Sequence, residues 1–324
     1  MARFILGHAF RSLGDRNPGV QRALFLLDHA FFSALLWLIR LLPPVPAARF
    51  GARIGAFLGP RFKKSRALEE NFRVALPELD AAARRDAARE AWGNAGAVFA
   101  EFAHLEAISD PQGDGLEVRI LGEIAAFTDS TKPAIFVLPH QGNWEMSGAA
   151  IVRQGVPLTA VYSPPTNPLL GELLRRWRIR IGCELIARDE SMRPMIKALS
   201  SGRSLGIVMD RRVDSGKPVM LFGHPKPTTL VPARLAIRYG YELVPIHVER
   251  LGPARFRVSF HPPVAVPEGD DELQQALEMT EQLHRLFEQW IRQCPGSWFA
   301  SKRLWPKETY TSAAKAPDTR SAMP

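Results

Sequence analysis

The 324-residue sequence predicts an α/β fold: a mixed, mostly parallel sheet flanked by helices, preceded by an apolar N-terminal helix and a helical annex. The sheet is predicted because, from Leu116 onward, short apolar runs alternate with helical stretches. The annex is predicted because a long helical pattern precedes this region and ends at the breaker sequence ISDPQGDG, near Asp110. A chain of this length can bury one substantial core.

Residues 1–45 are expected to form a membrane-associating helical segment. The run from Ala23 to Ile39 is strongly apolar, and as a helix it would extend roughly 25 Å, slightly less than the hydrocarbon core of a bilayer. Four polar residues share one narrow stripe of that helix: Arg22, His29, Ser33 and Arg40. Such a helix can lie in the membrane interface or dock its stripe on the protein. A buried core helix is the alternative, and a signal peptide is not favoured because no A-x-A-like cleavage site follows.

Residues 46–110 are predicted to form the helical annex. Gly51, Gly55 and Gly59 lie on one helix face, and small residues four apart permit close helix contact, in lipid or in protein. A basic group follows, suited either to anionic headgroups or to solvent: Arg61, Lys63, Lys64 and Arg66. Asp80 is a typical N-cap residue for the long helix that ends the annex.

Residues 111–305 are predicted to form the α/β domain. Seven apolar runs are its strand candidates: LEVRIL, AIFVLP, LTAVY, CELIA, SLGIVM, ELVPIHV and RFRVSF. AIFVLP is apolar at every position, as expected of a central strand buried on both faces. Residues 306–324 lack periodicity and are expected to form a disordered tail.

The amino-acid composition restricts which classes of binding partner are expected. The formal net charge of +9 favours acidic partners, such as anionic lipids, carrier proteins or nucleic acid. Nucleic acid is disfavoured because no zinc-finger, RNP-like or homeodomain-like pattern occurs. Cys183 and Cys294 form no CxxC motif, so we expect neither a disulfide framework nor a metal site, and the working compartment is expected to be reducing.

The sequence LPHQGNWE, residues 138–145, carries the candidate chemistry. His140 follows the predicted central strand, at the sheet edge where α/β folds place their sites. Gly142 permits a tight turn and Asn143 can cap the next helix, which would bring Glu145 close to His140. A histidine held by a carboxylate is a general base. The alternative is a capping asparagine beside a histidine with a purely structural hydrogen bond.

Other nucleophile motifs are lacking: the sequence contains no G-x-S-x-G, HExxH or P-loop pattern, and neither cysteine lies in a nucleophile-like context. The base would therefore act on a bound hydroxyl or on water, without a covalent acyl-enzyme.

The segment resembles the H-x(4)-D/E block of glycerolipid-type acyltransferases and, in its HQGNWE form, that of the bacterial lipid A biosynthesis (lauroyl/myristoyl) acyltransferase family. The resemblance runs from about Phe62 to Trp305 and includes NFRVALPEL, VYSPPTNP, IVMDRRVDSGKPVMLFGHPKPT and PGSWFASKRLWP. It departs from the family pattern at Ser163, where an arginine is common, at Arg211, where a glutamine is common, and at SKRLWP, where a histidine-arginine pair is common. The change at Arg211 puts the identity of the acceptor in doubt.

The resemblance implies that His140 is the base and Glu145 its partner. It also suggests a set of substrate-binding residues: Asn143, Trp144, Asn167, Arg180, Asp210, Arg211, Phe222, Gly223, Thr228 and Arg234. The run VPARLA, which contains Arg234, is expected to start a helix that points at the site and binds an anion. Lys302 and Arg303 are expected to contact phosphate or an acidic carrier.

The implied function is that of a membrane-associated O-acyltransferase without a cofactor. It would move a fatty acyl chain from acyl carrier protein or acyl-CoA to a glycolipid hydroxyl at the cytoplasmic face of the inner membrane, and a lipid A precursor is the expected acceptor. Three alternatives remain open: a thioester hydrolase, an acyltransferase for a lysophospholipid or phosphatidylinositol mannoside, and a non-catalytic lipid-binding protein.

Overall fold

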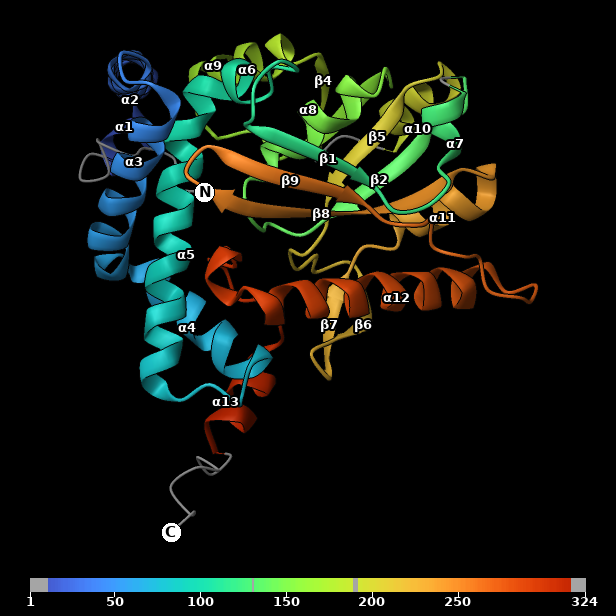
Figure 1. The fold of residues 1–324 in the computed structure, drawn as a ribbon. Helices are drawn as coiled ribbons and strands as arrows, with labels where there is room; N and C mark the ends of the chain where they lie inside the picture. Colours follow the sequence, from blue (N-terminus) through green and yellow to red (C-terminus); the bar gives the residue numbers. More distant parts are fainter. Residues whose placement is uncertain (1–10, 130, 189–191, 316–324) are drawn as a thin grey trace.

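The computed structural model describes residues 11–129, 131–188 and 192–315. Within them a seven-stranded sheet has the order β1-β9-β8-β2-β5-β3-β4 (Figure 1). Its strands are β1 (Leu116–Ile120), β2 (Ala134–Leu138), β3 (Leu158–Tyr162), β4 (Cys183–Ala187), β5 (Ser204–Val208), β8 (Glu242–Gly252) and β9 (Arg255–Phe260). Each corresponds to a predicted run. All neighbours are parallel except β8 and β9, which confirms the mixed, mostly parallel sheet.

The two faces of the sheet carry separate cores. All five residues of β2 are buried, and they alternate: Ile135 and Val137 belong to one apolar cluster, Phe136 and Leu138 to the other. The first cluster is completed by α10 (Arg193–Ser200), α11 (Val231–Tyr239) and α12 (Glu272–Gln293), and the second by α8 (Glu145–Arg153). Strand β2 is therefore central, with helices on both faces of the sheet.

A two-stranded hairpin, β6 (Lys217–Leu221) and β7 (His224–Thr228), was not expected from the sequence. Three prolines in this segment argue against a strand, but a short hairpin outside the main sheet tolerates them. Phe222 and Gly223 form its turn with φ values of 51° and 72°. Positive φ at both central positions matches the twist of a two-residue hairpin loop.

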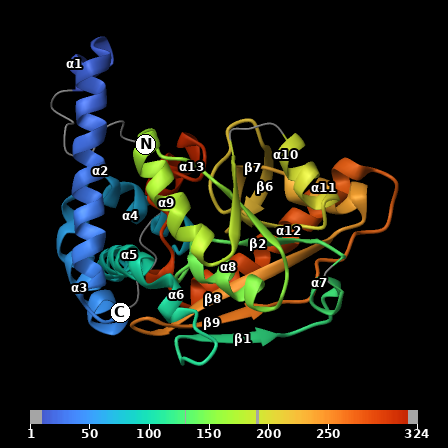
Figure 2. The same cartoon turned by 90° about the horizontal axis from the view of Figure 1, so that it is seen from above.

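The N-terminal third of the chain is helical and lies at one end of the molecule (Figures 1 and 2). Its helices are α1 (Arg11–Arg16), α2 (Pro18–Arg40), α3 (Pro44–Leu58), α4 (Lys63–Ala75), α5 (Ala81–Glu101) and α6 (Leu105–Ile108). Asp80 caps α5 by accepting a hydrogen bond from the Ala83 N–H at 2.8 Å, as predicted. Residues 1–10 of the predicted N-terminal segment lie outside the described residues.

Helix α2 is not a core helix. Its buried residues are Leu24, Asp28, Leu36 and Ile39, and most of its other apolar side chains are exposed. By length and composition it is the sort of helix that can cross a membrane. The predicted polar stripe is only partly covered by protein: Arg22 and Arg40 are exposed and His29 and Ser33 half-buried. Asp28, which lies off that stripe, is fully buried.

The glycines of α3 contact protein. A Cβ added at Gly51 would lie 2.3 Å from the Gly96 carbonyl oxygen, and one at Gly55 would lie 2.2 Å from that of Trp92. Both contacts are on α5, so the glycine face serves close packing between two helices of the annex.

The region predicted as a disordered tail is partly folded. Residues Lys307–Lys315 form α13, in which Tyr310 is buried and donates a hydrogen bond to the Asn71 side chain at 2.5 Å. The prediction was wrong for these residues because a single buried tyrosine can anchor a segment without apolar periodicity. Residues 316–324 lie outside the described residues.

Candidate active site

His140 emerges two residues after β2, at the carboxyl end of the sheet. Its Nδ1 lies 2.5 Å from Asp210 Oδ1, and its backbone N–H donates to Asp210 Oδ2 at 3.0 Å. An ionised carboxylate only accepts hydrogen bonds, so Nδ1 carries the proton and Nε2 is the free basic nitrogen. His140 also lines a cavity, so this nitrogen belongs to a ring with access to a ligand.

Asp210 reaches His140 because β5 is the parallel neighbour of β2. The two strands end at the same edge, where the Met209 N–H donates to the Leu138 carbonyl at 3.0 Å. The indole N–H of Trp298 donates to Asp210 Oδ2 at 2.9 Å. Burial opposes ionisation of Asp210, but His140 and Trp298 together hold the pKa of this carboxyl well below its usual range. Asp210 is thus a buried anion positioned against the imidazole.

The turn after His140 is fixed by the C-terminal segment. Gly142 has φ 58°, and a Cβ there would lie 2.4 Å from the Val248 carbonyl oxygen, so a close approach of backbone requires glycine. Its N–H donates to the Ser297 carbonyl at 3.1 Å, and the Phe299 N–H donates to the His140 carbonyl at 2.9 Å. Segments about 155 residues apart in the sequence therefore form one rigid loop pair.

A buried lysine supports the Asp210 loop from below. Lys226 of β7 is fully buried, and its Nζ donates to the carbonyl oxygens of Asp210 at 3.0 Å and Arg211 at 3.3 Å. Burial lowers the pKa of Lys226 to about 8, although nearby Asp210 favours its charged form. The hairpin that the sequence did not predict thus positions the loop that holds His140.

Glu145 does not hold the imidazole, which corrects the expectation that it pairs with His140. Its carboxylate accepts two hydrogen bonds from Arg178 of α9 (Pro168–Arg180), at 2.8 Å and 2.5 Å. Both side chains are largely buried, with 11% and 18% exposure. Burial raises the pKa of Glu145, but Arg178 and the Trp144 indole outweigh it and lower the pKa below its usual value.

His140, Trp144, Glu145 and Arg178 line one cavity of about 620 Å³. Most of its remaining wall is apolar and comes from β2, β3, β4, β5 and α8, with Leu138, Ile151, Leu158, Ile181 and Leu185 among the lining residues. A volume of this size is typical of a small-ligand site. The catalytic-type groups therefore lie at the polar part of an apolar pocket.

Two residues of the HQGNWE segment have different positions. Trp144 is in the cavity wall, and its ring packs edge-on against the His140 ring with centroids 5.1 Å apart. Asn143 is fully buried behind the wall, where its amide donates to Glu101 at 3.0 Å and its carbonyl accepts from the Glu145 N–H at 3.2 Å. Asn143 thus links the annex to the site and is not positioned for substrate.

Two other predicted substrate-binding residues are structural. Asn167 caps α9 by accepting from the Leu169 N–H at 3.0 Å, and its amide donates to the Phe25 carbonyl of α2 at 3.0 Å. Arg180 lies over the Trp177 ring and 3.6 Å from Glu106. Neither lines the cavity.

The hairpin residues and Arg234 also lie away from the cavity wall, whereas Arg211 lines it. Phe222 and Gly223 form the hairpin turn, and Thr228 is buried with its hydroxyl on the Lys226 carbonyl. Arg234 pairs with Glu272 at 2.7 Å, although the start of its helix, Val231 and Pro232, does line the cavity.

Sequence reasoning missed two residues that organise the site, Lys226 and Trp298, and did not distinguish a third, Arg178, from its neighbours. Arg178 was one of several arginines in LLRRWRIRIG with no signal to single it out. Trp298 lies in the PGSWF block, which is part of the family resemblance. Nothing in that block indicates that its indole N–H donates to Asp210. Within the described residues, no group of three His, Cys, Asp or Glu side chains is arranged to hold a metal ion.

The sequence model for bacterial lipid A biosynthesis acyltransferases matches residues 21–307. A phosphatidylinositol mannoside acyltransferase of Mycolicibacterium smegmatis is 26% identical over 198 residues, or 60% of this chain and 63% of that protein. The lipid A biosynthesis myristoyltransferase of Escherichia coli is 27% identical over 172 residues, or 51% of each chain. The chain thus covers less than two thirds of either relative.

Among solved structures, the 1-acyl-sn-glycerophosphate acyltransferase PlsC of Thermotoga maritima aligns with 79% of this chain and 97% of its own, at 16% identity and a TM-score of 0.36.

Proposed function

Because the chain belongs to the bacterial lipid A biosynthesis acyltransferase family, we propose that it transfers a fatty acyl chain from a thioester to a hydroxyl group of a glycolipid. One observation carries the proposal: an imidazole held by a buried carboxylate opens into a largely apolar cavity of about 620 Å³. The first feature supplies a base and the second a place for an acyl chain.

In the proposed reaction, Nε2 of His140 takes the proton of the acceptor hydroxyl as its oxygen attacks the thioester carbonyl. Asp210 stabilises the imidazolium and keeps Nδ1 protonated. The tetrahedral intermediate collapses by breaking the carbon–sulfur bond, and the thiolate leaves with the proton from His140. An ester forms, a thioester breaks, and no cofactor is required.

Glu145 and Arg178 have a separate proposed role. Arg178 lines the cavity and is the cation nearest to Glu145, which holds it through two hydrogen bonds. We assign Arg178 to stabilising the negative charge on the carbonyl oxygen and Glu145 to fixing its position. Asn143 is not assigned this role because it is buried behind the wall.

The acceptor is proposed to be a lipid A precursor or a related glycolipid. The relatives are named as lipid A biosynthesis or phosphatidylinositol mannoside acyltransferases, so a glycolipid is common to both names. The donor is proposed to be acyl carrier protein or acyl-CoA, both acidic and therefore complementary to a chain of net charge +9.

The enzyme is proposed to act at the cytoplasmic face of the inner membrane. Support comes from α2 and α3, which leave bulky apolar side chains exposed, including Trp37 at 62% and Phe57 at 61%. Aromatic and aliphatic side chains of this kind insert into the boundary between headgroups and acyl chains. Such contact would bring the site to a lipid acceptor.

The test is transfer of radiolabelled acyl groups by the purified full chain, with and without a glycolipid acceptor. His140→Ala is expected to lower transfer by about 10²–10⁴-fold, while His224→Ala, remote from the cavity, serves as the matched control. Both variants should unfold at the same temperature as the wild type. Transfer by His140→Ala at the wild-type rate would refute the assignment.

The same assay separates the alternatives. Free fatty acid released at equal rates with and without acceptor would indicate a thioester hydrolase, and lipid binding without turnover in any variant would indicate a binding protein.

A further inference from the structure

A buried asparagine of the annex bonds both segments of the loop pair that carries His140. The side-chain amide of Asn94, on α5, donates to the Gly142 carbonyl oxygen at 2.8 Å and to the Ser297 carbonyl oxygen at 3.2 Å. An NH2 group has two hydrogens to donate, so a single side chain can serve both carbonyls. These two hydrogen bonds, here called the Asn94 bridge, join the turn after His140 to the C-terminal segment.

The orientation of the Asn94 amide is set by Arg250, near the end of β8. Arg250 Nε donates to Asn94 Oδ1 at 2.8 Å, so the amide oxygen faces the guanidinium and the NH2 group faces the two carbonyls. Both other guanidinium nitrogens donate to the carboxylate of Glu101, Nη2 at 2.9 Å. Because the guanidinium is planar and its donors are fixed in direction, Arg250 cannot rotate without breaking these bonds.

Glu101, at the end of α5, is a fully buried anion with partners from three segments. Besides the two bonds from Arg250, its carboxylate accepts from the Asn143 amide at 3.0 Å and from the Ala254 N–H at 3.2 Å. Burying an ion pair costs less when further hydrogen bonds satisfy its oxygens, as they do here. The Glu101–Arg250 pair therefore holds the HQGNWE turn in two ways, directly at Asn143 and indirectly through the Asn94 bridge.

The Asn94 bridge lies next to two groups that share one carboxylate. Trp298 directly follows one of the bridged residues and donates to Asp210, while His140 lies two residues before the other and bonds the same carboxylate. The distance between the two bridged segments therefore determines whether Asp210 can bond both partners at once.

The side chains of this network act from outside the cavity. Neither Asn94 nor Glu101 nor Arg250 lines it. A displacement of about 1 Å in a reacting group can lower a rate by about 10²-fold. A network that fixes the turn after His140 can therefore affect the reaction without touching a substrate.

We propose that Asn94 is a positioning residue for the reaction at His140, and that Arg250 and Glu101 set the orientation of its amide. The inference rests on the proposed acyl transfer. It assigns a role in the reaction to the annex, whose helix α5 supplies both Asn94 and Glu101.

The kinetic test uses two variants of the full chain. Asn94→Ala removes the bridge. Arg250→Lys keeps the positive charge opposite Glu101 but removes the Nε donor that orients the amide, and it serves as the second variant should Asn94→Ala fail to fold. Acyl transfer from palmitoyl-CoA to a glycolipid is measured below the unfolding temperature of the least stable protein.

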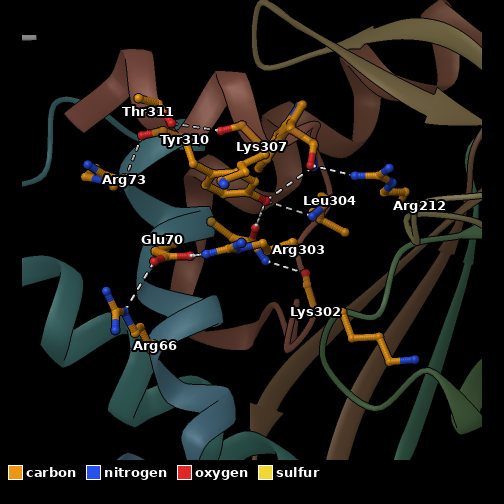
Figure 3. Close-up of polar contacts among 12 residues, drawn as sticks. Arg66, Glu70, Arg73, Arg212, Lys302, Arg303, Leu304, Lys307, Tyr310 and Thr311 are labelled. Carbon is orange, nitrogen blue, oxygen red and sulfur yellow. Dashed lines mark hydrogen bonds and ion pairs between the residues drawn. The ribbon is translucent and has the colours of Figure 1, made fainter. Parts of the chain in front are cut away.

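Tyr310→Phe is the matched control, because it also removes a buried polar group that holds the C-terminal segment. The Tyr310 hydroxyl accepts from the Leu304 N–H at 2.8 Å (Figure 3) and from the Trp305 N–H at 3.2 Å, and it donates to Asn71 at 2.5 Å. These contacts lie farther along the segment than the Asn94 bridge. A lower unfolding temperature is expected for the control as well as for Asn94→Ala.

A positioning role predicts a loss in kcat and not in KM. Asn94→Ala should lower kcat by about tenfold to a hundredfold, and Arg250→Lys by less, with KM within about threefold of the wild type because the cavity wall is unchanged. Tyr310→Phe should keep the wild-type kcat. A wild-type kcat for Asn94→Ala, or for Arg250→Lys where Asn94→Ala does not fold, would overturn the inference, as would an equal loss for Tyr310→Phe.

A spectroscopic measurement separates this inference from the proposed function. The proton of a short imidazole–carboxylate hydrogen bond gives a proton NMR signal far downfield of the backbone amides, and its loss in Asp210→Asn identifies the signal of His140. In the free protein this signal should broaden or disappear with Asn94→Ala and persist with Tyr310→Phe. That result supports the positioning role even if no protein transfers acyl groups. An unchanged signal in Asn94→Ala refutes it, whatever the activity.

Discussion

The carboxyl end of the sheet and the N-terminal helices differ in the kind of side chain that they bury and expose. At the sheet, Asp210 is 3% exposed and its carboxylate accepts hydrogen bonds from His140 and Trp298. On α2 and α3, large apolar side chains are left uncovered: Leu26, Leu27, Phe31, Trp37, Leu38, Phe50, Ile54 and Phe57. One region buries charge and the other exposes hydrocarbon.

Neither arrangement is the one that would give a soluble protein its greatest stability. Buried charge is costly unless it is paired with good geometry, and Asp210 meets this condition through His140 and Trp298, which it holds in place. Large apolar patches are rare on soluble monomers and mark contact surfaces. The two regions thus indicate function through different departures from an ordinary globular protein, and each departure can be tested separately.

The largest expected effect comes from replacing the carboxylate that holds His140. Asp210→Asn should lower kcat by about 10²–10⁴-fold, because an amide can donate to Nδ1 and so favour the wrong tautomer of His140. Glu145→Gln should lower kcat less, by about tenfold, because Arg178 remains in the wall. The measurement is single-turnover acyl transfer across pH 5–9.

Glu145→Gln is the matched control, since it also removes one buried carboxylate charge close to His140. A larger loss for Glu145→Gln than for Asp210→Asn would show that the interaction of Glu145 with the imidazole forms during the reaction.

Buried titratable groups also predict that the folded protein loses stability at acid pH. His284 of α12 is fully buried beside Lys226, and its Nδ1 donates to the Met220 carbonyl at 2.7 Å. Burial, and then the charge of Lys226, lower the pKa of His284 to about 3 from an ordinary 6.5. Between pH 6.5 and 3 the unfolded chain binds a proton that the folded chain does not, so stability falls as pH falls.

For one group with this shift the loss is on the order of a few kcal/mol. Urea unfolding at pH 7, 6, 5 and 4 should therefore show a shallower decline for His284→Gln than for the wild type. His247, whose pKa burial lowers to about 4, contributes in the same direction, so the decline should persist in part. Parallel curves for the two proteins would contradict the prediction.

The helical side should be sensitive to packing within the annex. Gly55→Ala places a Cβ against the Trp92 carbonyl oxygen and should lower the free energy of unfolding by about 1–3 kcal/mol. Gly252→Ala, where an added Cβ meets nothing within 4 Å, should have little effect. Equal stabilities would mean that α3 and α5 separate easily, as expected if the glycine face packs against lipid.

The sequence predicts an element well when the residues of that element themselves carry the pattern, and poorly when contacts with distant residues determine the structure. The seven sheet strands were predicted because each is a short apolar run, and β2 was recognised as central from its continuous apolarity. The β6–β7 hairpin was missed because its prolines and alternating polar residues carry no strand signal. Helix α13 was missed because one residue, Tyr310, anchors it.

In the site, the sequence identified His140 and placed it correctly at the strand end. It chose Glu145 as the partner because Glu145 is near in the sequence, whereas Asp210 is 70 residues away and becomes a neighbour only through the pairing of β2 with β5. Asp210 was predicted to bind substrate, but it does not line the cavity and instead holds His140, a contact that depends on the sheet order. Contacts between distant segments were the part that local patterns could not predict.

The smallest effect on the protein itself is expected at the exposed apolar face. Phe31→Ser/Trp37→Ser should weaken binding to vesicles of anionic phospholipid by about tenfold to a hundredfold, because two side chains with 44% and 62% exposure lose apolar area. Stability should change by less than about 0.5 kcal/mol, since neither side chain is buried.

Leu251→Ser/Leu273→Ser, both 42% exposed and outside the N-terminal helices, is the control for general loss of surface hydrophobicity. Vesicle sedimentation that falls equally for both pairs would show that α2 has no special affinity for lipid. A fall for the first pair alone, with transfer to a detergent-dispersed acceptor preserved, would separate membrane contact from catalysis.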